Sequence, residues 1–397
     1  MSALAAANAR LLALCDAAAQ RSDALAPLRR AGREAFAASG LPDTSREEWR
    51  YTNLAALAAH EFALAPAWAP VVMGGGGEIT SLREHAAAQG LGDLVDLKQH
   101  PLAALATALV ENGLVIRSAA SADVAPIALA FAASASERAL ISLPRLRVEA
   151  ARGSRVAVVL DCTSAGARAA HFTNAIIEVD AAPNAQVDLT LVQREHDEAF
   201  HASLTAVRLA RDARFTSRVV TLGGRLVRND LSVVLAGEGA ECTLDGLYLG
   251  TGERVVDNHS LVDHAVPHCA SRQLYKGVLG GASQGVFRGR VIVRPGAQKT
   301  NAAQSNPNLL LADGAEIDTK PQLEIYADDV KCSHGSAIGR LDENALFYLR
   351  SRGLGEREAR ALLTHGFAAE ILNALPESLR EECSAEFAHR VAEDAKS

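Results

Sequence analysis

The sequence is poor in aromatic residues, in closely spaced cysteines and in clustered positive charge. Only 4% of its 397 residues are aromatic although 49% are apolar, so Ala, Val and Leu must fill the core. Small aliphatic side chains suit thin repeated layers better than a few bulky clusters. The net charge of −7 argues against a nucleic-acid surface, which requires Lys and Arg gathered on one face. No apolar run approaches the ~18 residues of a membrane span, so we expect no membrane partner.

Closely spaced thiols are absent as well. The sequence has no C-x-x-C, and its six cysteines stand far apart: Cys15, Cys162, Cys242, Cys269, Cys332 and Cys383. Scattered thiols in a chain this long do not form a disulfide framework, so we expect reduced cysteines and a cytoplasmic protein. The Ala-rich N-terminus lacks the basic segment of a signal peptide, which favours a cytosolic helix. Common catalytic motifs are missing too: there is no G-x-S-x-G, no H-E-x-x-H and no G-x-G-x-x-G at a strand–helix junction.

The first region, residues 1–110, is expected to be mostly helical. Thr44 and Glu47 have the spacing of a capping box, which predicts that a helix begins after Pro42. Trp49, which follows directly, is interpreted as a side chain that anchors this region in a core.

The second region, residues 111–338, loses the helical period. Short apolar or alternating runs recur between turn residues, and a turn-plus-strand unit returns around five alanines: Ala185, Ala213, Ala240, Ala297 and Ala315. The first two intervals are 28 and 27 residues, which indicates a right-handed parallel β-helix, or solenoid. A β-sandwich is the alternative, but it does not explain the longer period. The stretch "NAAQSNPNLLL" (301–311) supplies amide side chains that could stack as ladders inside a solenoid. The predicted fold class is therefore mainly β, with a solenoid core flanked by α-helical regions.

The third region, residues 339–397, returns to the helical period. Asp342 is the predicted N-cap of a helix that ends at Gly353. The next helix carries an apolar stripe at three- and four-residue spacing: Ala359, Leu362, Leu363, Phe367 and Ile371. Part of this stripe should pack within the helical domain.

One pair of reactive side chains stands at the end of the core, in "VKCSHGSAIG" (330–339). In a strand, Cys332 and His334 point to the same face. A thiol beside an imidazole begins a metal site or a nucleophile–base pair, yet two groups complete neither. If the pair is functional as a cluster site, another subunit must bring the remaining ligands. The alternative is a buried thiol next to a capping imidazole.

Two other groups of polar residues are candidates for a site. Residues 257–269 hold many metal-ligand types, but their spacing matches no closed zinc pattern, and turn or buried ladder residues are the competing interpretation. Parallel β-helices also include secreted enzymes that cleave carbohydrates with carboxylates and basic residues in an outer groove. "DDVK" (328–331) and "RGRV" (288–291) could serve such an enzyme, although acidic pairs at solenoid corners are mostly solvated turn residues.

Long stretches of the sequence resemble the SufB/SufD family of iron–sulfur cluster assembly proteins. The resemblance is carried by "TKPQLEIYADDVKCSHGSAIGRLDENALFYLRSRGL" (319–354), by the preceding "FRGRVIVRPGAQKTNAAQSNPNLLLADGAEIDT" and by "REEWRYTNL" near the N-terminus. The "KCSHG" version followed by "FYLRSRG" looks like the SufD branch. A SufB-like primary scaffold, the alternative, would be longer and carry further cysteines in the solenoid.

The resemblance implies a non-catalytic scaffold subunit in a complex of SufB, SufD and the ATPase SufC. It implies that the solenoid pairs with SufB and that the C-terminal helices dock SufC, with homodimers as a possibility in the absence of SufB. His334 matches the family histidine implicated at the SufB–SufD interface, as cluster or metal ligand, and Cys332 matches its neighbour. The iron–sulfur cluster would be transient and shared with SufB, with none bound stably by this chain alone. Arg352, Glu356 and Arg360 are our hypothesis for the SufC-docking surface.

Overall fold

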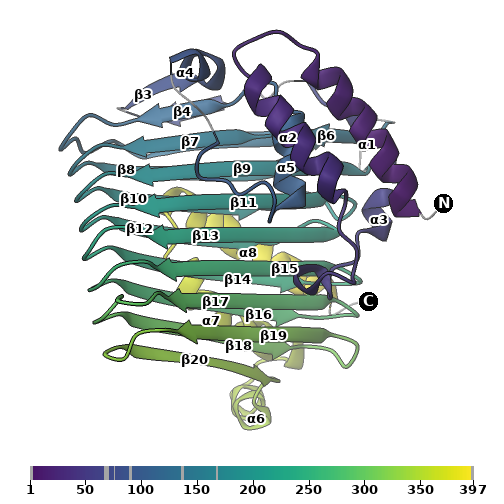
Figure 1. Ribbon diagram of the computed structural model, residues 1–397. Helices are drawn as coiled ribbons and strands as arrows, with labels where there is room; N and C mark the ends of the chain where they lie inside the picture. The colour runs from purple at the N-terminus through teal and green to yellow at the C-terminus, as the bar shows by residue number, and fades with distance from the viewer. Residues whose placement is uncertain are drawn as a thin grey trace.

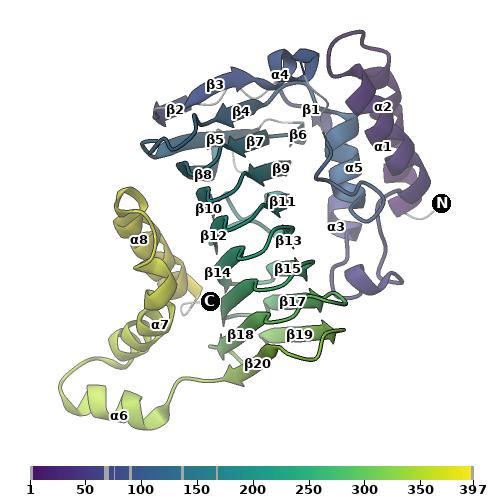
Figure 2. The ribbon, with the colours of Figure 1, turned by 60° about the vertical axis from the view of Figure 1, so that its left-hand side comes forward.

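The computed structural model describes residues 3–66, 71–75, 77–88, 92–135, 138–166 and 169–394. Its core is a parallel β-helix with helices on two opposite sides (Figures 1 and 2). The predicted fold class, a mainly β solenoid flanked by helical regions, is confirmed. Within the described ranges, no helix has both the length and the apolar character needed to cross a membrane.

Two sheets form the walls of the β-helix, and the chain alternates between them. Sheet A contains, from the C-terminal end of the stack, β19 (Glu316–Ile325), β17 (Gln284–Val293), β15 (Val255–His264), β13 (Leu226–Leu235), β11 (Phe200–Leu209), β9 (His171–Ala181), β7 (Arg145–Ala150), β4 (Leu114–Arg117) and β3 (Glu78–Ser81). Two short strands extend this sheet: β6 (Leu140–Ser142) pairs with β9, and β1 (Ala63–Leu64) pairs with β6. Sheet B contains, from the other end, β2 (Val71–Gly74), β5 (Ile127–Ala135), β8 (Arg155–Gly166), β10 (Gln186–Gln193), β12 (Arg214–Thr221), β14 (Glu241–Gly250), β16 (Ala270–Leu279), β18 (Asn301–Leu310) and β20 (Lys331–Gly339). All pairs are parallel except β2 with β5 and β3 with β4 at the N-terminal end.

The predicted repeat is real, but only four of the five alanines lie in the same kind of corner. Ala185, Ala213 and Ala240 are buried and directly precede the sheet B strands β10, β12 and β14. Ala315 precedes β19 in sheet A, and Ala297 lies in a turn four residues before β18. Ala297 still shares the corner of the first three alanines, between a strand of sheet A and the next strand of sheet B, whereas Ala315 lies in the other corner, between β18 and β19. Each coil has two corners, and both require a small inward side chain, so alanine spacing alone cannot tell them apart.

The interior of the β-helix follows from the alternation of side chains along each strand. Val227, Val233 and Leu235 of β13 point inward and are buried, while Arg228 and Asp230 of the same strand point to the outer face. Repetition of this pattern in successive coils builds one continuous apolar core from small aliphatic residues. This is the layered packing that the low aromatic content requires.

The N-terminal helices cover the outer face of sheet A. They are α1 (Ala3–Ala19), α2 (Ala26–Ser39), α3 (Ala55–Ala58), α4 (Leu82–Ala88) and α5 (Pro101–Ala108), with a 3₁₀ turn η1 (Glu47–Trp49). Phe36, Trp49 and Leu105 join Phe172 and Phe200 of the sheet in one buried cluster. The predicted anchoring role of Trp49 is confirmed. The predicted helix start at Thr44 is wrong. The Asp43 carboxylate accepts hydrogen bonds from the amide and the hydroxyl of Ser45, which forms a turn, and only a 3₁₀ turn follows.

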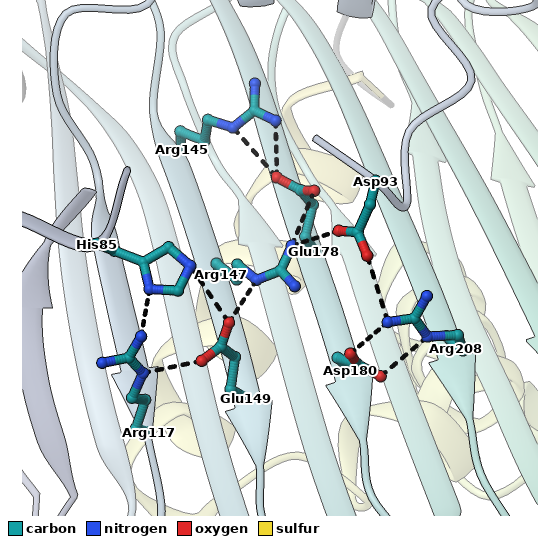
Figure 3. Close-up of polar contacts among 9 residues, drawn as sticks. All are labelled: His85, Asp93, Arg117, Arg145, Arg147, Glu149, Glu178, Asp180 and Arg208. Carbon is teal, nitrogen blue, oxygen red and sulfur yellow. Dashed lines mark hydrogen bonds and ion pairs between the residues drawn. The ribbon is translucent and has the colours of Figure 1, made fainter. Parts of the chain in front are cut away.

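Ion pairs tie this covering layer to sheet A (Figure 3). Arg145 and Glu178 are both nearly inaccessible, and the guanidinium donates to the carboxylate at 2.7 Å and to Thr107 of α5 at 3.1 Å. Arg147 donates to Asp93 at 2.8 Å, in the segment before α5. Buried charges need partners at close range, because an unpaired charge left in the interior costs several kcal/mol. The network therefore fixes where the N-terminal layer can sit.

A second buried ion pair anchors η1. Asp257 of β15 accepts hydrogen bonds from Arg228 at 2.8 Å and from Thr52, and its other oxygen lies 2.9 Å from His259 Nε2. The centre of the Trp49 indole ring lies 3.8 Å from the Arg228 guanidinium. Burial by itself would raise the pKa of Asp257, but the charges of His259 and Arg228 and the bonds from His259 and Thr52 outweigh it and hold the pKa at about 2. Asp257 therefore stays ionised in the folded protein.

The C-terminal helices lie on the opposite side, against the outer face of sheet B (Figure 2). They are α6 (Glu343–Ser351), α7 (Glu356–Leu372) and α8 (Glu377–Asp394). Ile371 and Phe387 pack with Val220, Leu247 and other sheet B residues in an apolar cluster. Asp342 caps α6 by accepting from the amide of Asn344, as predicted. In the apolar stripe of α7, Ala359 and Ile371 are buried, whereas Leu362 is 51% exposed.

We predict that Asp257→Asn lowers the free energy of unfolding at pH 7 by about 3 kcal/mol, because it leaves Arg228 short of a buried carboxylate. The folded-state pKa of about 2 lies below the usual value near 3.9, so the carboxylate stabilises the fold above pH 4 and loses that effect between about pH 4 and 2. The gap between variant and parent in urea unfolding should therefore shrink at pH 2.5. Asp263→Asn, on the same strand, removes a solvent-exposed pair with Arg294 and should cost under about 1 kcal/mol. An equal loss of unfolding free energy in both variants would contradict the role of Asp257 as a buried, stabilising carboxylate.

Candidate functional site at the open end of the solenoid

The C-terminal end of the β-helix is open. β19 and β20 are the last strands of sheets A and B, and in the part of the chain that the structure describes no strand pairs with their outer edges. The helices lie on the two flanks and leave this end uncovered (Figures 1 and 2). Apolar side chains are exposed here: Ile325 by 41%, Tyr326 by 60% and Ile338 by 53%. An edge with free N–H and C=O groups is a template for pairing with another chain.

Cys332 and His334 lie on β20, at this edge, and share one face. In the parallel register Cys332 is opposite Ala302 and His334 is opposite Gln304, and both partners are buried inside the solenoid. The two side chains therefore occupy inward positions of the final coil, where no further coil covers them. Cys332 is half-buried and His334 is exposed. Because His334 is exposed, it is not an imidazole enclosed within this chain.

Cys332 and His334 differ in how easily they can act as a metal ligand or a nucleophile. Burial raises the pKa of the Cys332 thiol, and the sulfur packs at the margin of the apolar core. It is therefore mainly protonated near neutral pH, and a thiol must lose its proton to act as nucleophile or ligand. The exposed imidazole of His334 needs no such activation, because a neutral ring nitrogen already offers a lone pair to iron. Within the described residues no group of three or more His, Cys, Asp or Glu side chains has the arrangement of a metal site.

Behind His334 runs a ladder of buried amides, as the "NAAQSNPNLLL" stretch suggested. Gln304 donates to Gln273 at 3.0 Å, and Ser260 donates to the same Gln273 oxygen at 2.7 Å. Asn306 and Asn308 continue the pattern toward Tyr248. Sequence reasoning found these amides but did not connect Gln304 with His334, because only the register of β18 and β20 brings the two together.

The polar cluster at 257–269 does not form a metal site. Strand alternation divides it: Asp257, His259 and Asp263 point to the outer face, while His264 points inward and binds the Ser271 hydroxyl at 2.9 Å. Burial lowers the pKa of His264 to about 4, so the ring is neutral near pH 7. His268 occupies a corner with φ 61°. These residues anchor and shape the solenoid.

The groups considered for carbohydrate cleavage do not come together either. Arg290 pairs with Glu324 at 2.6 Å on the outer face of sheet A. Asp328 and Asp329 lie in the exposed corner between β19 and β20, where Asp329 pairs with Lys299. A shared groove with paired carboxylates is not formed by these residues.

The hypothetical docking residues lie where α6 meets α7. Glu356 pairs with Arg360 at 3.3 Å and with Arg350 at 3.7 Å, and Arg352 lies over the ring of Tyr348 at 5.2 Å. Two side chains that the sequence analysis did not single out are more conspicuous: Phe347 is 74% exposed and Tyr348 57%. α6 packs on α7 and stands away from the rest of the molecule (Figure 2).

Comparison with known proteins agrees with this geometry. The SufBD core domain of the SUF system for FeS cluster assembly matches residues 131–367, which include most of the β-helix, the open end and α6. The chain belongs to the SufB/SufD family. It is 36% identical over 280 residues to an iron–sulfur cluster assembly SufBD family protein of Synechocystis, covering 68% of this chain and 62% of that protein. It is 36% identical over 253 residues to the iron–sulfur cluster assembly protein SufD of Escherichia coli, covering 64% and 60%.

A third SufB/SufD relative, from Mycobacterium leprae, is 35% identical over 270 residues, covering 66% of this chain and 67% of its own length. The chain thus spans about three-fifths of the length of the first relatives that it matches. The matched part in each case is large enough to carry the solenoid.

We predict that iodoacetamide at pH 7.5 labels Cys332 before any other cysteine, because the other five are buried. Labelling should still be slower than that of free cysteine, since burial raises the pKa of this thiol. Peptide mass spectrometry over a time course measures both rates, and Cys332→Ser should abolish the first event. Labelling faster than free cysteine would mean that the thiol is activated.

Proposed function

We propose that the chain is a non-catalytic scaffold subunit that takes part in iron–sulfur cluster assembly together with a SufB paralogue and the ATPase SufC, in the cytoplasm. Membership of the SufB/SufD family supports the assembly role. The observation that carries the scaffold role is the open end of the solenoid, where exposed apolar residues and His334 meet two strand edges that no other described strand pairs with.

The partner at this end would extend both sheets. A SufB solenoid that pairs its own edge strands with β19 and β20 satisfies their free backbone groups and covers Tyr326 and Ile338. Two copies of this chain could pair through the same edges when SufB is absent. Pairing of either kind encloses the inward positions of β20, so His334 and Cys332 would come to lie between two subunits.

A cluster at this place is cargo, and we expect none to stay on the chain by itself. Iron–sulfur clusters are held mainly by cysteine thiolates, with histidine as an occasional ligand. His334 is the first choice as a ligand and Cys332 the second, because the thiol is partly packed and mainly protonated. The remaining ligands would come from SufB. The absence of a second accessible thiol here favours this shared site over a SufB-like primary scaffold.

The ATPase would dock on the outward part of the C-terminal helices. We define the docking surface as Phe347, Tyr348 and Leu362, with the charged residues Arg352, Glu356 and Arg360 around them. Exposed aromatic side chains anchor interfaces, whereas exposed ion pairs add little affinity. α7 and α8 hold this surface in place because their other face is buried on sheet B.

We predict that His334→Ala folds and binds its partners yet reduces cluster formation at least tenfold in a reconstituted complex, because an edge residue contributes little to the repeated core. Absorbance of the cluster and pull-down of SufB measure the two effects. Cys332→Ser should have a milder defect. Cluster formation at the parent rate by His334→Ala would refute the ligand role.

We also predict that Phe347→Ala combined with Leu362→Ala weakens SufC binding at least tenfold, while Arg360→Ala alone changes it less than threefold. Calorimetry with purified ATPase measures the affinity. Tyr326→Ala, an exposed aromatic at the open end, is the matched control and should leave SufC binding intact. Point substitutions are preferable to deletion of the helices, since deletion would uncover the apolar face of sheet B. Full binding by the double variant would remove this surface from consideration.

A further inference from the structure

The amide ladder inside the solenoid ends on an unused hydrogen-bond acceptor. Gln304 is only 4% exposed, and its Nε2 donates to Gln273 Oε1 at 3.0 Å. Its Oε1 is buried and has no hydrogen-bond partner among the residues that the structure describes. A buried carbonyl without a donor is costly, about 1–3 kcal/mol, so such a group points to a partner that is absent or displaced.

The direction of this acceptor follows from the register. Gln273, Gln304 and His334 are consecutive rungs on β16, β18 and β20, about 4.8 Å apart in the direction of the backbone hydrogen bonds. The amide nitrogen of Gln304 is turned back toward Gln273. Its oxygen is therefore the end of the ladder that is available to the next rung, and the next rung is His334.

The position of Gln304 is also fixed from across the solenoid. Gly289 of β17 faces the amide, and a Cβ at that glycine would lie 1.9 Å from Gln304 Nε2. A side chain at position 289 would push the amide out of the ladder. The glycine thus provides the room in which Gln304 sits beside His334.

We infer that Gln304 is a positioning residue for His334: its carbonyl accepts the imidazole N–H and so directs the other ring nitrogen out of the open end. Neutral imidazole has one N–H and one lone pair, and a hydrogen bond to one nitrogen selects the tautomer and the direction of the other. A histidine that binds a metal through one ring nitrogen commonly donates the N–H of the other to a carboxylate or carbonyl oxygen. An uncharged amide suits the task, because a carboxylate there would favour the doubly protonated ring, which has no lone pair.

The positioning role can be tested without any cluster. Nitrogen-15 NMR of histidine-labelled protein reports the tautomer of each ring, and His334→Ala identifies the His334 signals. The parent should show one dominant tautomer for His334. Gln304→Met keeps the length of the side chain but removes the acceptor, and it should shift the His334 nitrogens to the values of free histidine. Gln322→Met, a glutamine on the outer face of β19, is the matched control and should change nothing.

The link to cluster assembly rests on the proposed function and has its own readout. In the reconstituted complex, Gln304→Met should lower the rate of cluster formation roughly tenfold while binding of the SufB paralogue persists. Gln304→Glu should lower it as well, with His334 nitrogens that show the doubly protonated ring. Thermal unfolding of each variant confirms that it is folded.

Separate results overturn separate claims. An unchanged His334 tautomer in Gln304→Met refutes the positioning role, whatever the rate of cluster formation. If the tautomer changes as expected but His334→Ala assembles clusters at the parent rate, the positioning role stands and the proposed ligand role fails.

Discussion

Pairing between successive coils is the constraint on which the rest of this structure depends. Each coil satisfies its backbone N–H and C=O groups only through the coil before it and the coil after it. Inside the stack the arrangement repeats without cost, but a stack must end. At the C-terminal end two strands, β19 and β20, have no following coil among the described residues. The proposed pairing site is thus a direct consequence of how the fold is built.

The flanking helices restrict where a partner can approach. Both walls of the β-helix have covered faces, with α5 and its neighbours over sheet A and α7 and α8 over sheet B (Figure 2). The buried pairs Arg145–Glu178 and Arg228–Asp257 of sheet A bind the first layer through Thr107 and Thr52. Apolar packing holds the second layer, together with ion pairs such as Arg194–Glu382. Among the described residues, the open end and α6 are two surfaces that these layers leave uncovered, and they lie near each other in the same part of the molecule (Figure 1).

Polar groups inside the solenoid follow the same logic of repetition. A buried amide can form a hydrogen bond with the equivalent amide in the adjacent coil, as Gln304 does when it donates to Gln273. The last amide of such a column is left incomplete, just as the last strand is. His334 stands next to that incomplete amide. The C-terminal end of the β-helix therefore offers both a strand edge to a partner and a hydrogen-bond acceptor to the imidazole of His334.

The sequence by itself determined the solenoid class, the helical ends and the pair Cys332–His334, because period-two alternation and a repeat of about 28 residues are local signals. Local patterns also identified the N-cap Asp342 and the buried Trp49. They failed for Thr44, because Asp43 accepts hydrogen bonds from Ser45 and only a 3₁₀ turn follows. They also did not separate Ala315 from the other four alanines, because both kinds of corner use the same small side chain. Tertiary structure alone decided that Phe347 is exposed and that Gln304 lies beside His334. The exposure of Phe347 depends on how α6 packs on α7, and the neighbourhood of Gln304 and His334 depends on a strand register between residues 30 positions apart, which no local pattern records.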